Sequence, residues 1–246
     1  MSKLFIDIMR GFLEFSEITG REELFPEIIK AVAGGIDKTE CKRFDGDIYV
    51  IKAENARGAA NNLFELFYDS DSGEEKENAV FDCRRCESDG IKYSDYLYAY
   101  KKRDFDQATE KEQSKQANEK TFRSLLNEYI INFKPNEING KKNLRLDITP
   151  QGKFIATKKC GYKSIICDLS ASERILFNFL CFIGINAFLQ FVNGVKDFNY
   201  KEKPLIVINF SEFLTEEFDY IAFLQKQNLK RKIFLIGEFN VPKRSH

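Results

Sequence analysis

Residues 48–68 read IYVIKAENARGAANNLFELFY and predict a β-strand, a short polar turn and an amphipathic helix in direct succession. β-Branched and aromatic residues dominate the first part, which favours a strand. Leu63, Phe64 and Phe67 recur at the three- and four-residue spacing of one helical face. Strand, tight turn and helix in this order are the layout of a phosphate-binding loop, but the turn lacks the residues that give such a loop its chemistry.

The composition of the chain is that of a globular protein. Of its 246 residues, 43% are hydrophobic and 31% are charged. Lysine plus arginine and aspartate plus glutamate number 38 each, so no bulk attraction to nucleic acid is expected. The six cysteines are irregularly spaced and the N-terminus lacks a signal-peptide pattern, which predicts reduced thiols and a cytoplasmic location. The only histidine is His246, the last residue, which excludes a catalytic triad or zinc site built on an internal histidine.

Four segments are expected along the chain. Residues 1–40 form a helical segment, and residues 41–103 hold the opening strand, turn and helix, followed by an antiparallel hairpin. Residues 104–132 form a short helical insertion. Residues 133–246 begin with a second hairpin, continue with a long apolar helix and end with a strand, a helix and a strand. This succession predicts an α/β protein with a mixed sheet, an antiparallel β subdomain and a helical insertion.

The longest apolar stretch is Ile175–Val192, whose 18 residues lie near the lower limit for crossing a bilayer. It contains Asn178, Asn186 and Gln190 and has no basic cluster on one side. We therefore expect a helix buried on all sides within the protein and no association with a membrane.

A polar motif precedes this apolar helix and consists of Leu169, Ser170, Ala171, Ser172 and Glu173. Either serine can cap the helix, and the free amide groups behind the cap would favour an anion. The motif resembles the signature of ABC ATPases, especially the SMC, RecF and RecN kind of head domain, which acts in DNA maintenance. Members of this family typically show a leucine, a serine, two small residues and then glutamate or glutamine. The simpler interpretation is a capped helix start without further function.

Other segments follow in the order that the resemblance implies, over residues 44–240. AENARGAANN, at residues 53–62, takes the place of the Walker A loop. PLIVINF, at residues 204–210, takes the place of the Walker B strand. KIFLIGE, at residues 232–238, takes the place of the strand that leads to the switch histidine. The resemblance implies an ABC ATPase-like head domain.

The loop departs from the family pattern where phosphate chemistry resides. In G-x-x-x-x-G-K-[ST], the lysine reaches the phosphates and the hydroxyl binds Mg²⁺. Asn55 and Gly58 match the pattern of the family. Alanine replaces the first glycine, the lysine and the hydroxyl residue, at Ala53, Ala59 and Ala60.

Three more functional positions of the family are replaced. Asn209 takes the place of the Walker B aspartate, Phe210 that of the glutamate expected to position water, and Glu238 that of the switch histidine. Phosphoryl transfer depends on positioning and charge neutralisation, and these replacements supply neither. Engineering could have produced the adjacent alanines at 59–60, but the other three replacements would need a separate explanation, which favours natural loss.

The resemblance implies a catalytically inactive pseudo-ATPase subunit that binds no nucleotide or metal at its own site. In the family, ATP lies between the Walker loops of one subunit and the signature of another, so Leu169–Glu173 would share ATP and Mg²⁺ with a partner. The expected partner is an active ABC/SMC-like ATPase or a second copy of the chain. DNA would be reached through that complex, in DNA maintenance or in defence against foreign DNA. Two alternatives are a divergent ATPase with weak turnover and a non-enzymatic adaptor.

The cysteines offer a weak alternative site. Cys83 and Cys86 form one C-x-x-C pair, and Cys160 and Cys167 could complete a zinc site. However, the pair lies within AVFDCRRC, which looks like a strand. Residues three apart on a strand point to opposite faces. Buried thiols are the simpler expectation.

Overall fold

The computed structural model describes residues 2–34, 39–68, 79–83, 137–138, 141–142, 144–148, 154–160, 162–166, 168–192, 204–210 and 220–237. The chain forms two compact units. The first unit contains residues 1–83, 198–214 and 219–246, and the second contains residues 84–197 and 215–218. Each unit is described by itself.

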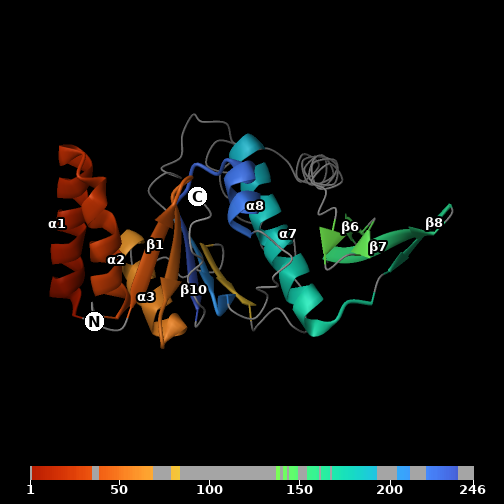
Figure 1. Cartoon of the computed structure of the whole chain (residues 1–246), viewed down its shortest axis with the longest axis horizontal. Helices are drawn as coiled ribbons and strands as arrows, with labels where there is room; N and C mark the ends of the chain where they lie inside the picture. Colours follow the sequence, from red (N-terminus) through yellow and green to blue (C-terminus); the bar gives the residue numbers. More distant parts are fainter. Residues whose placement is uncertain are drawn as a thin grey trace, which may run out of the picture. The chain divides into compact units, whose positions relative to one another are not determined.

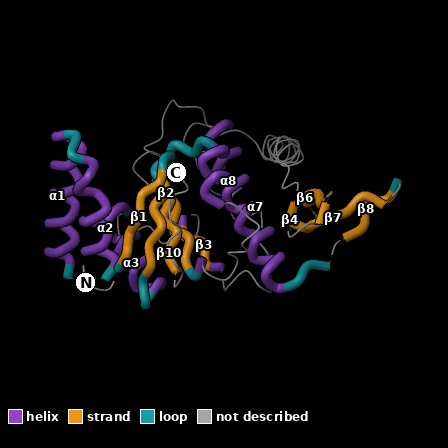
Figure 2. Tube along the Cα trace, in the orientation of Figure 1, coloured by secondary structure: helices purple, strands orange, loops and turns teal. Residues whose placement is uncertain are grey.

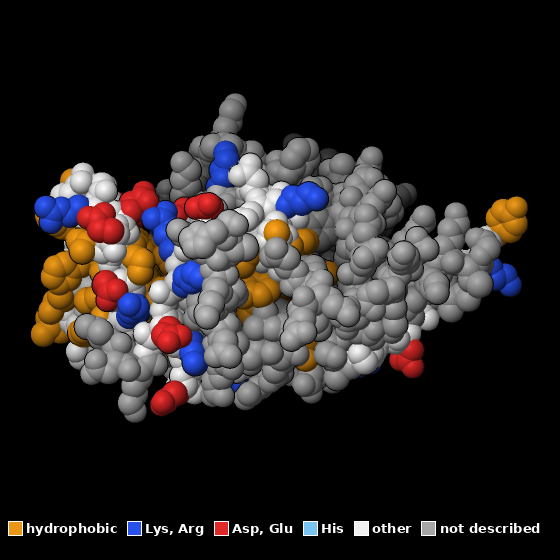
Figure 3. Space-filling view, viewed as in Figure 1, with side chains coloured by type: hydrophobic (Ala, Val, Ile, Leu, Met, Phe, Trp, Pro, Cys, Tyr) orange, Lys and Arg blue, Asp and Glu red, His pale blue; other side chains and the backbone are white. Residues whose placement is uncertain are grey.

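Two helices open the first unit, as the apolar periodicity of the sequence predicts. Helix α1 (Lys3–Thr19) begins after Ser2, whose hydroxyl accepts a hydrogen bond from the amide of Phe5 at 3.3 Å, and it ends at Gly20 in the left-handed conformation. A short 3₁₀ helix, η1 (Glu22–Leu24), leads into α2 (Phe25–Ala33). Hydrophobic side chains gather over α1 on the face seen in Figure 3.

A five-stranded mixed sheet forms the centre of the first unit (Figures 1 and 2). Its spatial order is β1-β2-β10-β9-β3, so the last strand in the sequence lies between β2 and β9. The edge strand β1 is antiparallel to β2, and the other neighbours are parallel. The five strands are β1 (Glu40–Phe44), β2 (Ile48–Lys52), β3 (Val80–Asp82), β9 (Leu205–Ile208) and β10 (Ile233–Gly237).

The inner strands are almost continuously apolar because both faces of the sheet are buried. On one face, α3 (Ala56–Phe67) packs on β9 and β10 and against α1 and α2. Tyr49 lies there between Phe25 and Phe234, with ring centroids 5.4 and 5.1 Å apart. Helix α8 (Tyr220–Gln227) contacts β2. The strand–turn–helix predicted over 48–68 is therefore confirmed and lies within this core.

The second unit contains small antiparallel sheets. The predicted hairpin is confirmed as β6 (Leu144–Ile148) paired with β7 (Phe154–Cys160), and β8 (Lys163–Ile166) adds a third strand. Two short strands, β4 (Glu137–Ile138) and β5 (Lys141–Lys142), pair with each other.

Helix α7 (Ala171–Val192) follows these strands in the second unit. Residues 175–187 are all buried, which confirms the expectation of a helix covered on every side. Among the residues that the structure describes, no helix combines the length and apolarity needed to cross a membrane.

The predicted helical insertion and the first predicted hairpin lie wholly or partly outside the residues that the structure describes. The helical insertion at 104–132 lies outside the described residues. Of the hairpin expected near residue 80, only β3 is described, and it pairs in parallel with β9. The strand expected to complete that hairpin, at residues 92–102, also lies outside the described residues.

Candidate functional site

The carboxyl ends of four parallel strands meet at one edge of the sheet. The backbone register places Ile51, Ile236, Ile208 and Asp82 in one row across β2, β10, β9 and β3. Open α/β sheets bind ligands at this edge because the loops that follow the strands converge there. The loop after β2 and Asn209 after β9, which the sequence singled out separately, are thus brought to the same edge.

The loop after β2 is short. Only residues 53–55 separate the strand from α3, and the amide of Ala53 extends the sheet ladder by donating to the carbonyl of Gly237 at 3.1 Å. The Asn55 side chain caps α3, because its Oδ1 accepts a hydrogen bond from the amide of Gly58 at 2.8 Å. Gly58 is already helical, and the amide that a bound phosphate would use is satisfied by Asn55.

Gly58, Ala59 and Ala60, which match the last three positions of the phosphate-loop pattern, lie in the first turns of α3 and are closely packed. A Cβ atom added to Gly58 would lie 2.7 Å from Nδ2 of Asn55, so the cap and the glycine depend on each other. Ala59 and Ala60 are 1% and 2% exposed and belong to the hydrophobic core beneath α3. The two methyl groups lie in the core, so the side chain of a lysine or a hydroxyl residue at either position would be surrounded by apolar side chains.

Asp82 links the end of β9 to the first turn of α3. Its Oδ1 accepts a hydrogen bond from Nδ2 of Asn209 at 2.7 Å, and its Oδ2 lies 3.3 Å from Nη2 of Arg57. The Asp82 side chain is 9% exposed, whereas that of Arg57 is 64% exposed. Asn209 has φ 57°, in the left-handed region that asparagine tolerates better than most residues. The edge therefore carries a hydrogen-bonded cluster of Arg57, Asp82 and Asn209.

Phe210, two residues after β9, is fully buried, and its ring packs edge-on against Tyr220 with centroids 4.9 Å apart. The position where the family places a water-orienting glutamate is thus part of the core. Glu238, directly after β10, lies outside the described residues.

The signature-like motif belongs to the second unit and forms the start of α7. Ser170 is exposed and immediately precedes the helix, and its carbonyl accepts the first helical hydrogen bond from the amide of Arg174 at 2.9 Å. Nη2 of Arg174 donates to the carbonyl of the buried Leu169 at 3.2 Å. Ala171, Ser172 and Glu173 lie in the first helical turn, and their side chains are outside the described part of the structure.

Sequence reasoning missed Arg57 and Asp82 as members of the cluster. The available signal was Asp82, a charged residue in the stretch AVFDCRR, which we expected to be the first strand of an antiparallel hairpin. Arg57 lay inside the singled-out loop but matched no position of the family pattern. Their meeting depends on the parallel pairing of β3 with β9, which joins distant parts of the sequence.

The structure describes only part of the weak zinc candidate. Cys83 is fully buried directly after β3, and Cys160 ends β7. Cys86 and Cys167 lie outside the described residues. Within the part of the chain that is described, no group of three or more histidine, cysteine, aspartate or glutamate side chains is placed to hold a metal ion.

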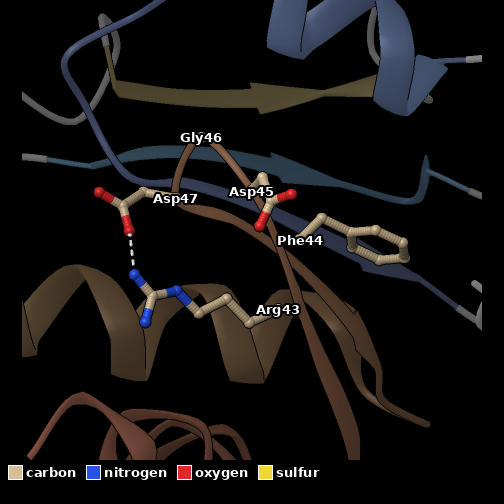
Figure 4. A pocket seen from close by; sticks show the side chains of 5 residues that line it. All are labelled: Arg43, Phe44, Asp45, Gly46 and Asp47. Atoms are coloured by element: carbon tan, nitrogen blue, oxygen red, sulfur yellow. Dashed lines mark hydrogen bonds and ion pairs between the residues drawn. The ribbon is translucent and has the colours of Figure 1, made fainter.

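A cavity of about 450 Å³ lies at the β1–β2 turn (Figure 4), at the amino end of β2 and so at the edge opposite the Asp82 cluster. It is lined by Arg43, Phe44, Asp45, Gly46 and Asp47. The Arg43 guanidinium pairs with Asp47 at 2.8 Å and with Glu22 at 2.7 Å. Its charge is already balanced by carboxylates of the protein, so the turn offers little to an anionic ligand.

Comparison of the chain with known protein families, with curated proteins and with solved structures found no match.

Proposed function

We propose that the chain is a catalytically inactive ABC/SMC-like head subunit that associates with and regulates an active ATPase of that kind. Its setting would be DNA maintenance or defence against foreign DNA. The observation that carries the proposal is the edge cluster. Strand, loop and helix follow one another in the order of a nucleotide site, yet Asn55 caps the amide of Gly58, and Asp82 is bound to Asn209 and Arg57.

Electrostatics at this edge support the loss of catalysis. A triphosphate requires positive charge and a metal ligand beside it. Arg57, in the first turn of α3, is paired with Asp82, and the position of the metal-holding aspartate carries the neutral amide of Asn209. The carboxylate of Asp82 would repel a phosphate placed against it.

The second unit retains the element that a partner would use. Ser170 is exposed at the start of α7, a helix of 22 residues. A helix start with an exposed serine favours an anion through its free amides and its dipole. In the proposed complex, this start faces the ATP held by the Walker loops of the partner.

The first experiment measures Mg²⁺-ATP binding and hydrolysis by the isolated full-length chain. Neither is expected above background. The double substitution Ala59→Lys with Ala60→Thr should not restore them, because both positions are buried. Turnover above background, lost in a variant of this loop, would favour the divergent ATPase instead.

The second experiment co-expresses the chain with the products of the genes that neighbour its own and measures ATP-dependent co-purification. Ser170→Glu and Ser170→Arg should abolish ATP-driven association while the partner still binds nucleotide. Tyr162→Ala is the matched control, because Tyr162 is fully exposed in the same unit. If both Ser170 variants associate as the wild type does, the motif is only a helix cap and the chain is better described as an adaptor.

A further inference from the structure

Helix α1 is apolar on two opposite faces, and only one of them is covered. Ile6, Met9 and Leu13 are buried against the rest of the first unit. The opposite face exposes five large apolar side chains by 49–85%: Leu4, Ile8, Phe12, Phe15 and Ile18. We call these five residues the outer face of α1.

The outer face is large for a surface without a partner. At about 150–200 Å² for each large apolar side chain, the exposed fractions of the five residues amount to roughly 500 Å² of apolar surface on one side of α1. Patches of this size on soluble proteins mark places of interaction, whereas single exposed apolar residues need no explanation.

The spacing of the outer face suits another helix. Leu4, Ile8, Gly11, Phe15 and Ile18 follow one another at intervals of four and three residues, the a/d pattern of a helix–helix seam. Gly11 lies in the middle of that seam, and a Cβ atom added there would meet nothing within 4 Å. Packing within the chain therefore does not require this glycine, although glycine destabilises a helix interior. Its place leaves room for a large side chain of a partner helix.

The charges beside the seam identify the kind of partner. Asp7 and Glu14 are exposed along one edge, and neither makes an ion pair or hydrogen bond in the structure as described. Lys3 is the basic residue near the start of that edge, whereas Arg10 turns inward and donates from Nε to the carbonyl of Leu66 at 2.8 Å. The edge is therefore mainly acidic.

A second copy of the chain fits this edge poorly. In an antiparallel pair with full overlap of the two seams, Asp7 of each copy would lie beside Glu14 of the other, and like charges would meet twice. In a parallel pair, the acidic edge would meet Phe12 and Thr19 and find no cation. An anionic lipid surface would likewise be repelled by the acidic edge.

We propose that the outer face of α1 is a docking surface for an amphipathic helix of another protein, with large apolar residues on one face and lysine or arginine along one edge. The proposal rests on α1 alone and does not depend on the proposed ATPase partnership.

The test uses the full-length protein and two synthetic helical peptides, each three heptads long with leucine at a and d. One peptide carries lysine along one edge and the other carries glutamate there. Fluorescence anisotropy should show the lysine peptide binding about tenfold more tightly, because two attractive contacts replace two repulsive ones. Substituting both Asp7→Lys and Glu14→Lys should reverse this preference.

Phe15→Asp and Ile18→Asp should each abolish binding without unfolding the chain, since both side chains are exposed. Circular dichroism checks the fold, and Ile166→Asp, at an exposed residue of the second unit, is the matched control. Absence of binding, equal binding of the two peptides, or binding that survives both substitutions would overturn the proposal. So would wild-type dimers in sedimentation, or co-sedimentation with phosphatidylglycerol vesicles, if Phe15→Asp removed either behaviour.

Discussion

Asparagine suits position 209 both in its backbone conformation and in the hydrogen bond that its side chain donates. Its φ of 57° is strained for most residues but tolerated by asparagine, and its amide donates to Asp82 at 2.7 Å. An aspartate would keep the size of the side chain but would replace a donor with a second carboxylate. The neutral amide thus allows Asp82 to remain close to the sheet edge, where it also pairs with Arg57.

Asn209→Asp is therefore expected to destabilise the protein by about 1–2 kcal/mol at neutral pH, through the lost hydrogen bond and the repulsion between carboxylates. Urea denaturation followed by fluorescence measures the change. Adding Asp82→Asn should recover most of the loss, since the amide and the carboxylate then exchange places. An Asn209→Asp protein as stable as the wild type, or one that gains stability with Mg²⁺, would contradict this account.

The Asn55 cap gives a second expectation. Asn55→Ala should lower the free energy of unfolding by about 1 kcal/mol, because the amide of Gly58 loses its partner. Asn55→Asp retains an acceptor at the same place and should stay close to the wild type. Equal stability of the two variants in chemical denaturation would mean that water replaces the cap without cost.

Strand β10 joins the elements of the first unit into one core. It pairs with β2 on one side and β9 on the other, and Phe234 packs against Tyr49 and Phe67 at centroid distances of 5.1 and 5.6 Å. A side chain in this position contacts the sheet and the helix layer at once. Its removal would leave a cavity that the surrounding strands cannot close.

Phe234→Ala should accordingly cost about 3–5 kcal/mol of unfolding free energy. Phe12→Ala, which removes the same ring from the exposed side of α1, should change stability by less than about 0.5 kcal/mol. Thermal melts of the two variants beside the wild type make the comparison. Similar melting temperatures for both variants would show that Phe234 is not central to the core.

Local patterns in the sequence predict α1, β2, α3 and α7 because each carries its own apolar periodicity or a continuous apolar run. They also predict the β6–β7 hairpin, whose strands are close neighbours in sequence. Pairing of β3 with β9 could not be predicted, since nothing local specifies a distant partner. The cluster of Arg57, Asp82 and Asn209 depends on that pairing. The loop pattern suggested a phosphate cradle, but Asn55 starts the helix at Ala56, before such a cradle would close.

The first unit is built from separated parts of the chain. Residues 1–83 supply α1, α2, α3, β1, β2 and β3, while β9, β10 and α8 come from beyond residue 197. The three strands of residues 1–83 therefore lack both strands that occupy the middle of the sheet. Without β9 and β10, the backbone edges of β2 and β3 that these strands cover have no hydrogen-bonding neighbour.

A fragment of residues 1–83 should consequently fail to fold cooperatively, because β2 and β3 are joined only through β9 and β10. Far-UV circular dichroism on heating should show a gradual loss of helix signal rather than a sigmoidal transition. The full chain, treated identically, is the control. A cooperative transition in the fragment would mean that α1, α2 and α3 form a sufficient core with the β1–β2 hairpin.

The position of β10 also governs when the protein can fold during its synthesis. A ribosome adds about 5–20 residues each second, so β2 emerges roughly 10–35 s before the strand that will lie beside it, about 180 residues further along the chain. During that interval, the edge of β2 that β10 will cover has no native neighbour and is open to pairing with other nascent chains. Production of this protein should therefore depend more than usual on chaperones that shield unfinished sheets.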